Sequence, residues 1–204
     1  TTGGSICPGS NATYTITVNP SPIAVATFVS NDTICSSTQV NIALSSTTPN
    51  TLFTWTAANG AGITGGTNSI AAGSNIQQTL TNSSAVIGTT TYTITPLSSA
   101  CPGTPIVVVA YVNPIAVMTG LAAQVSCPGA AISPNAFTSN PLGSVFNWTN
   151  SNIAIGLGAN GAGNIPSWNA PVNNTNVPIV GTISVTPTYN GCVGTPSNFL
   201  VTIN

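Results

Sequence analysis

The stretch CPGTPIVVVAYVNP at residues 101–114 decides the fold, because a version of it occurs three times in the chain. Residues 7–20 read CPGSNATYTITVNP, and residues 192–204 read CVGTPSNFLVTIN. In each version a cysteine lies 12 positions before an asparagine, and the cysteines are offset from one another by 94 and 91 residues. The chain is therefore a tandem array with a period of about 90 residues.

Other segments recur at the same spacing. The sequence FTWT at residues 53–56 matches FNWT at 146–149, and YTITP at 92–96 matches ISVTP at 183–187. These matches divide the chain into residues 1–19, expected to hold the last strand of a preceding repeat, and two full repeats at residues 20–113 and 114–204.

The local pattern within each repeat is that of β-structure. β-Branched residues alternate with Thr or Ser, and Gly, Pro and Asn mark the turns. The strands expected in the two repeats are 23–29, 40–44, 52–56, 75–80, 90–95 and 106–112, then 145–149, 182–186 and 199–203. Six or seven short strands in about 90 residues are typical of an immunoglobulin-like sandwich, so the predicted fold is all-β with tandem sandwiches. The pattern is weaker at residues 130–137, where Pro134 interrupts an expected strand.

Aromatic residues of the third strand are the expected core. Phe53 and Trp55 share one face of their strand, as do Phe146 and Trp148, and this position is buried between the sheets of such sandwiches. Trp168 has no counterpart in the first repeat. Core packing is the expected role of Trp168 as well, with contact to a sugar as the alternative.

The charged residues are almost entirely missing, which excludes most catalytic chemistry. The chain has no Lys, Arg or His, and its single acid is Asp32. Proton transfer near neutral pH needs His, a tuned carboxylate or a similar group, and a Ser or Cys nucleophile needs a base beside it. One Asp cannot form the carboxylate pair of a glycosidase. The sequence therefore predicts a protein that is not an enzyme.

The same composition argues against several kinds of binding. Nucleic-acid binding depends largely on Lys and Arg, and calcium or zinc sites need clustered acids, Cys or His. We therefore expect no nucleic-acid partner, no metal and no cofactor. No apolar run reaches the about 18 residues of a membrane span, so membrane insertion is not expected. The 42% of hydrophobic residues nevertheless predicts a folded chain.

Near-neutral charge has two further consequences. Little electrostatic repulsion keeps copies of the chain apart, which favours self-association. Trypsin-like proteases find no Lys or Arg to cleave. Both properties suit a protein outside the cell. We also interpret the chain as a mature segment of a longer protein.

Several motifs resemble those of a known family. The motifs are TICS at residues 33–36, VNI at 40–42, FTW at 53–55, YTITP at 92–96 and CPGTP at 101–105, the last repeated as CVGTP at 192–196. Together they resemble the PKD-like and immunoglobulin-like repeats of Bacteroidota surface proteins. Such arrays are typical of giant adhesins in gliding motility and attachment, exported by type IX secretion. The near-total loss of charge and the lack of a C-terminal sorting domain depart from that family.

The resemblance implies a structural role at the cell surface. We expect an extracellular repeat module of a surface filament or giant adhesin, forming a rigid uncharged shaft for attachment or gliding. Its partners would be neighbouring repeats or subunits, and surface polysaccharide. The tripeptide Asp32-Thr33-Ile34 is similar to the O-glycosylation signal of Bacteroidota, so Thr33 is a candidate for sugar attachment. Five Asn-X-Ser/Thr sequons are interpreted as incidental: Asn11, Asn31, Asn82, Asn147 and Asn173.

Two other functions compete with the structural one. A carbohydrate-binding module would use exposed aromatic residues, for which the candidates are Trp168, Tyr14, Tyr111 and Tyr189. Sugar sites normally add charged or His partners, which this chain lacks. An ice-binding protein would present a flat Thr face, for which the candidates are Thr89–Thr91, Thr93 and Thr95, or Thr13, Thr15 and Thr17. Thr is also simply a good outward-facing strand residue.

The five cysteines, Cys7, Cys35, Cys101, Cys127 and Cys192, are disulfide candidates in an oxidising compartment. Pairing within a repeat would join Cys35 to Cys101 and Cys127 to Cys192, with Cys7 bonded to a partner before residue 1. In an immunoglobulin-like sandwich, however, these two positions lie at opposite ends, about 20 Å apart, whereas bridged Cα atoms lie about 5.5 Å apart. A bond across the repeat junction, from Cys35 to Cys192, is the second alternative. The other three cysteines would then pair with neighbouring repeats or subunits, and free thiols are the third alternative.

Overall fold

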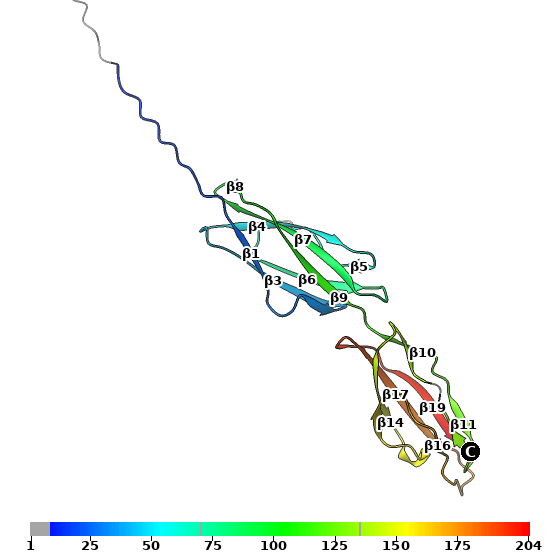
Figure 1. Cartoon of the computed structure of the whole chain (residues 1–204). Helices are drawn as coiled ribbons and strands as arrows, with labels where there is room; N and C mark the ends of the chain where they lie inside the picture. Colours follow the sequence, from blue (N-terminus) through cyan, green and yellow to red (C-terminus); the bar gives the residue numbers. More distant parts are fainter. Residues whose placement is uncertain (1–8, 70, 135) are drawn as a thin grey trace, which may run out of the picture.

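Alternation of apolar and hydroxyl side chains along the strands produces two β-sandwiches, which lie end to end (Figure 1). The structure is a computed structural model that describes residues 9–69, 71–134 and 136–204. The all-β fold with tandem immunoglobulin-like and PKD-like sandwiches, predicted from the repeats, is confirmed. The chain passes from the first sandwich to the second at Asn113 and Pro114.

The first domain has two sheets. One contains, in spatial order, β1 (Ala24–Phe28), β3 (Thr38–Ser46), β6 (Asn75–Asn82) and β5 (Ile63–Thr64). The other contains β2 (Thr33–Cys35), β9 (Ile106–Asn113), β7 (Gly88–Ser98) and β4 (Leu52–Asn59), with β8 (Cys101–Pro102) paired to β7. The pairing of β2 with β9 is parallel, and the other pairs are antiparallel.

The second domain contains a sheet equivalent to the β2-β9-β7-β4 sheet of the first domain, and its facing layer has shorter strands. The larger sheet contains β11 (Gln124–Ser126), β19 (Ser197–Ile203), β17 (Ile179–Tyr189), β14 (Val145–Asn150) and β15 (Asn160–Ala162), with β18 (Cys192–Val193) paired to β17. Two short pairs form the facing layer: β10 (Val117–Thr119) with β13 (Thr138–Asn140), and β12 (Ala131–Ile132) with β16 (Trp168–Asn169). A single 3-10 turn, η1 (Ile153–Ile155), completes the described elements.

The facing layer of the second domain is broken where Pro134 was expected to interrupt a strand. In the first domain β3 is continuous over nine residues. In the second domain the corresponding stretch holds two short strands, β12 and β13, on either side of Pro134. Proline has no backbone N–H for a ladder hydrogen bond, so a continuous strand cannot run through this position.

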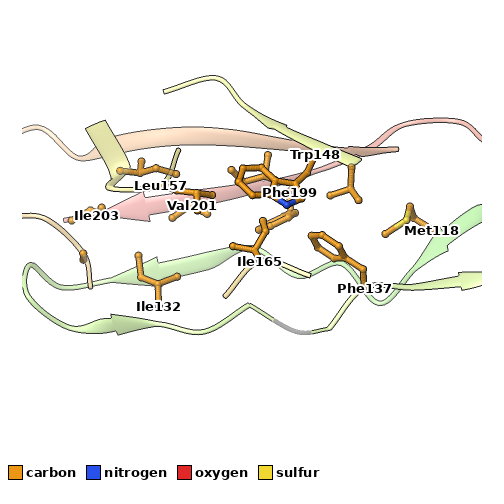
Figure 2. Close-up of a cluster of buried hydrophobic side chains, with 13 residues drawn as sticks. Met118, Ile132, Phe137, Trp148, Leu157, Ile165, Phe199, Val201 and Ile203 are labelled. Atoms are coloured by element: carbon orange, nitrogen blue, oxygen red, sulfur yellow. The ribbon is translucent and has the colours of Figure 1, made fainter. Parts of the chain in front are cut away.

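Each domain buries its own hydrophobic core. Phe53 of β4 is 3% exposed in the first core, and Trp148 of β14 is 7% exposed in the second. Figure 2 shows Trp148 beside Phe199, with Phe137, Ile165 and Ile132 on the facing side of the second core. Trp55 and Phe146 were also expected in the core. They pack against its edge and are only partly buried.

The segment before the first domain departs from expectation. The repeat register predicts a last strand within residues 1–19, yet residues 9–19 form no strand, and all are exposed. Tyr14, Ile16 and Val18 are each at least 87% exposed, although their counterparts in β19, Phe199, Val201 and Ile203, are buried. A strand needs a partner to pair with, and no described strand of the chain lies beside this segment (Figure 1).

Candidate functional site

The two domains meet at a junction that contains Cys35, one of the five predicted disulfide residues. Cys35 ends β2, which runs parallel to β9 so that Cys35 lies opposite Asn113. The chain then turns sharply, because the Ser36 N–H donates to the Asn113 carbonyl at 2.9 Å and Ser37 has a positive φ of 64°. Cys35 and the end of β9 therefore lie side by side at the junction.

A buried polar network fixes this end of the first domain. Asn82 is 6% exposed, and its Nδ2 atom donates to the carbonyls of Val86 and Val112, each at 2.8 Å. The Ser84 hydroxyl donates to Asn82 Oδ1 at 2.7 Å, and Ser36 Oγ accepts from the Asn82 N–H at 2.8 Å. Each buried amide group thus has a partner, as stability requires. Because its amide is used in this way, the sequon at Asn82 is structural.

Cys192 approaches the junction from the other side, on a tight hairpin. It lies opposite Tyr189 in the pairing of β17 with β18, and the two turn residues are Asn190 and Gly191. Their φ angles are 46° and 80°, as in the two-residue turns that match the twist of a hairpin. The hairpin places Cys192, which is 1% exposed, against the end of the first domain.

Cys35 and Cys192 form a disulfide bond, with their Cα atoms 5.5 Å apart. This is the pairing of the cross-junction alternative, and the within-repeat pairing is excluded because both sulfur atoms are already used. Cys101 and Cys127 are not bonded in the structure, and Cys7 lies outside the described residues. The sequence alone could not choose between these alternatives, because connectivity depends on which ends of the sandwiches meet.

The peptide that links the domains is packed into the junction. Asn113, Pro114 and Ala116 are all buried. Gly194 lies so close to the Ala116 carbonyl oxygen that a Cβ atom at Gly194 would overlap it. The side chains of Asn190 and Asn113 also approach each other across the junction, with Nδ2 and Oδ1 3.5 Å apart. Two covalent connections, the peptide and the disulfide (the junction disulfide below), therefore link the domains.

The candidate glycosylation residue lies on the same edge. Thr33 is exposed at the start of β2, two residues before Cys35, and its hydroxyl donates to Asp32 Oδ1 at 3.1 Å. The side chain is thus open to an attaching enzyme while its strand is held to β9.

The candidate aromatic platform residues do not converge. Trp168 is partly buried against the second core, and its Nε1 atom donates to the Ile155 carbonyl at 2.9 Å, so packing is its role. Tyr14 is exposed on the segment before the first domain, Tyr111 lies on β9, and Tyr189 lies on β17.

A depression beside Trp55 was not expected from the sequence. It has a volume of about 460 Å³ and lies over the outer face of β4 and β7. Its lining residues are Thr54, Trp55, Thr56, Asn68, Ser69, Ala71, Thr93 and Thr95. Trp55 itself is half-buried at the edge of the core, where its Nε1 atom donates to the Thr67 carbonyl at 3.1 Å. Among the ice-binding candidates, Thr90 points inward and is fully buried, so the five Thr do not share one face.

Charged side chains have little part in the structure, because the chain has one acid and no Lys, Arg or His. The described residues contain no group of three or more His, Cys, Asp or Glu side chains that could hold a metal ion. In the same part of the chain, no helix is long and apolar enough to cross a membrane. Burial raises the pKa of the Tyr92 phenol to about 12.

Comparison with known proteins supports the fold and its class. Residues 32–116 match the model of the PKD-like domain family. PKD-like and immunoglobulin-like domains are structural units that are typically non-catalytic. The junction disulfide and the PKD-like domain together indicate an extracytoplasmic protein. A search of curated protein sequences found no match.

Several solved multidomain structures are similar to the chain. The FN1–FN3 domains of chicken CNTN1 are 12% identical with a TM-score of 0.41, covering 91% of this chain and 68% of theirs. The N-terminal eight Ig domains of Down Syndrome Cell Adhesion Molecule are 8% identical, with a TM-score of 0.43 and coverage of 90% and 25%. The insect immune protein hemolin is 11% identical, with a TM-score of 0.39 and coverage of 90% and 47%. The chain thus spans less than half the length of the last two.

Proposed function

We propose that the chain is a structural repeat module of an extracellular filament or giant adhesin, which acts as a rigid shaft for attachment or gliding. The observation that supports this function best is the junction, where a peptide and a disulfide both connect the two sandwiches. Two connections at one junction restrict bending and twisting, whereas a single flexible linker would leave the domains free to move.

The position of the junction disulfide also gives it a mechanical effect. Cys35 and Cys192 are 157 residues apart in sequence, so the bond encloses most of both domains. When the ends of the chain are pulled, the covalent path runs from Cys35 directly to Cys192. The residues between them cannot be drawn out, even if their sandwich unfolds. A shaft made of such units would stay short under load.

The lack of charge is consistent with assembly outside the cell. With a formal net charge of −1, copies repel one another weakly, so neighbouring repeats or subunits can pack closely. Surface polysaccharide is the second proposed partner, since neutral polar surfaces can contact sugar without charge complementarity. The proposed role in gliding derives from the family resemblance.

Electron microscopy of the protein on the cells that produce it tests the proposal. Filaments should appear with an axial repeat that matches the end-to-end sandwiches. A population made up only of separate globular particles at native abundance would contradict the shaft function.

A carbohydrate-binding module is the second candidate, and the depression beside Trp55 is the observation that favours it. The depression is lined by Thr, Ser and Asn side chains beside Trp55, and such polar groups can contact neutral sugars. Calorimetric titration with neutral oligosaccharides tests this candidate. Binding that Asn68→Ala and Thr93→Val both weaken would support it, and equal binding by these variants would place the sugar elsewhere.

A further inference from the structure

The far end of the second domain carries a cysteine in the same position as Cys35. In the first domain β2 runs parallel to β9, and Cys35 lies opposite Asn113. In the second domain β11 runs parallel to β19, and Ser126 lies opposite Ile203. The next residues in this register are Cys127 and Asn204, so Cys127 is the structural equivalent of Cys35.

The polar network at this end is also repeated. Asn173 Nδ2 donates to the carbonyls of Val177 and Ile203, at 2.9 and 3.5 Å. The Thr175 hydroxyl donates to Asn173 Oδ1 at 2.7 Å, as the Ser84 hydroxyl does to Asn82. The end of the second domain is therefore built like the end of the first, which binds a following domain.

The near end of the first domain carries the equivalent of Cys192. Cys101 lies opposite Ser98 after a two-residue turn, as Cys192 lies opposite Tyr189. Gly103 follows Cys101 by two positions and lies against the Pro22 carbonyl, as Gly194 lies against the Ala116 carbonyl. Both halves of the observed junction are thus present again, one at each outer end of the chain.

The equivalent residues at the two outer ends are more exposed than those at the internal junction. Asn113 and Pro114 are buried at the internal junction, whereas Asn19, Pro20 and Asn204 are exposed. Cys192 is buried and Cys35 is partly buried, whereas Cys101 is partly buried and Cys127 is exposed. The surfaces that are covered at the internal junction are open at the two ends.

We propose that Cys101 and Cys127 form disulfides with flanking repeats of the same kind, each reproducing the Cys35–Cys192 junction. Cys127 pairs with a Cys101-type cysteine of the following repeat, and Cys101 pairs with a Cys127-type cysteine of the preceding one. Each bond forms as two thiols lose two protons and two electrons to a disulfide oxidant, which is reduced to two thiols. The result is an array in which every junction has two covalent connections.

A fusion of two copies tests the proposal, because it creates one new junction between an intact end of each type. Residues 20–204 are placed directly after Asn204 of the full chain, which repeats the Asn-Pro step of residues 113–114. Cys7→Ser removes the remaining thiol of the first segment. After folding with oxidised and reduced glutathione, chymotryptic peptides are mapped, since trypsin has no site.

The expected product has a bond from Cys127 of the first copy to Cys101 of the second, beside two Cys35–Cys192 bonds. Moving the thiol along the strand, with Cys127→Ser and Val125→Cys, is the matched control and should give no such bond, although Val125 is 70% exposed. If Cys127 of the first copy and Cys101 of the second copy both remain reactive to an alkylating agent, the proposal is wrong. It is also wrong if the thiol moved to position 125 forms the bond equally well.

A second arm with the single chain identifies the source of the flanking repeat. Oxidation of the Cys7→Ser chain at high concentration gives linear multimers through Cys101–Cys127 if separate copies can join, and monomers if only consecutive repeats of one polypeptide do. The proposal depends on the tandem arrangement and deepens the proposed shaft function. If the bond does not form in the fusion, the disulfide proposal fails, but filaments could still be seen in micrographs. The disulfide proposal and the proposed shaft function can therefore fail independently.

Discussion

Tyr92 is the residue whose environment most clearly couples the two sheets of the first domain. Its ring is fully buried, and its hydroxyl donates to Gln78 Oε1 at 2.9 Å, which joins β7 of one sheet to β6 of the other. Gln78 also holds the loop at Thr67, where it accepts from the backbone N–H and donates to the carbonyl. The phenol therefore stabilises both the sandwich and the loop beside Trp55.

The raised pKa of Tyr92 predicts a loss of stability at alkaline pH. In the unfolded chain the phenol ionises near pH 10, whereas burial raises its folded pKa to about 12. Between these values the unfolded state has lost the proton that the folded state keeps, so the free energy of unfolding falls as pH rises. The loss should be about 1.4 kcal/mol per pH unit, or roughly 2–3 kcal/mol by pH 12. Denaturant titrations from pH 8 to 12 measure it.

The control variant is Tyr92→Phe, in a Cys101→Ser and Cys127→Ser background that prevents thiol exchange. This variant should be less stable at pH 8 by about 1 kcal/mol, because Gln78 Oε1 loses one of its two donors and keeps only the Thr67 N–H. It should also lack the alkaline decrease of the first domain. An equal decrease in the Phe variant would show that another group is responsible.

Thr33 predicts a mass difference between native and recombinant protein. If the Asp32-Thr33-Ile34 motif is glycosylated, protein from the producing organism should exceed the mass of the bare chain, and the excess should disappear in a Thr33→Val variant. Thr33 is exposed, so the substitution should leave the melting temperature nearly unchanged. A native mass equal to that of the bare polypeptide would reject the modification.

At the scale of elements, the two equivalent hairpins differ in how well their turn residues suit them. The first uses Ser99 and Ala100, with φ angles of 47° and 64°, and the second uses Asn190 and Gly191. Non-glycine residues adopt this left-handed region at a cost, and Asn-Gly is the preferred pair for such turns. Ala100→Gly should therefore stabilise the first domain by about 0.5–1 kcal/mol, and Gly191→Ala should destabilise the second by a similar amount.

Chemical denaturation with probes for each domain measures both changes. Trp55 and Trp148 report on the first and second domains when the other tryptophans are replaced by Phe. Opposite signs for the two variants are required, and a stabilising Gly191→Ala would contradict the turn assignment.

The elements also show where sequence patterns succeed. Strands with strict alternation, such as those at 40–44 and 106–112, were located within a few residues of β3 and β9. The interruption at Pro134 was foreseen because proline acts locally. The described part of the segment expected to hold a strand, residues 9–19, forms none, because a strand forms only when another strand supplies its hydrogen bonds.

At the scale of the whole molecule, the junction disulfide predicts how far the chain can be extended. Reduction frees the 157-residue separation between Cys35 and Cys192, which corresponds to roughly 520–565 Å of extended chain at about 3.3–3.6 Å per residue. Single-molecule pulling from the two ends should show this additional length only in reductant or in a Cys35→Ser variant. A Cys101→Ser variant is the control and should extend like the oxidised wild type.

The uncharged surface predicts that metal removal leaves the fold intact. One acid cannot supply a calcium site, so a chelator should leave the melting temperatures of both domains unchanged. Between pH 5 and 8 the melting temperatures should also stay constant, because the chain contains no His, Glu, Lys or Arg. Calorimetry with and without chelator measures this, and a marked drop in chelator would reveal a metal site.

The sequence by itself determined the repeat period and the all-β class, because these depend on residue types and on local alternation. Only the tertiary structure decided that Cys35 bonds to Cys192, that Trp55 lies at the core edge, and that Asn82 holds a strand end. Each of these depends on which ends and faces meet in space. Residues 157 positions apart come into contact only when two domains are placed end to end.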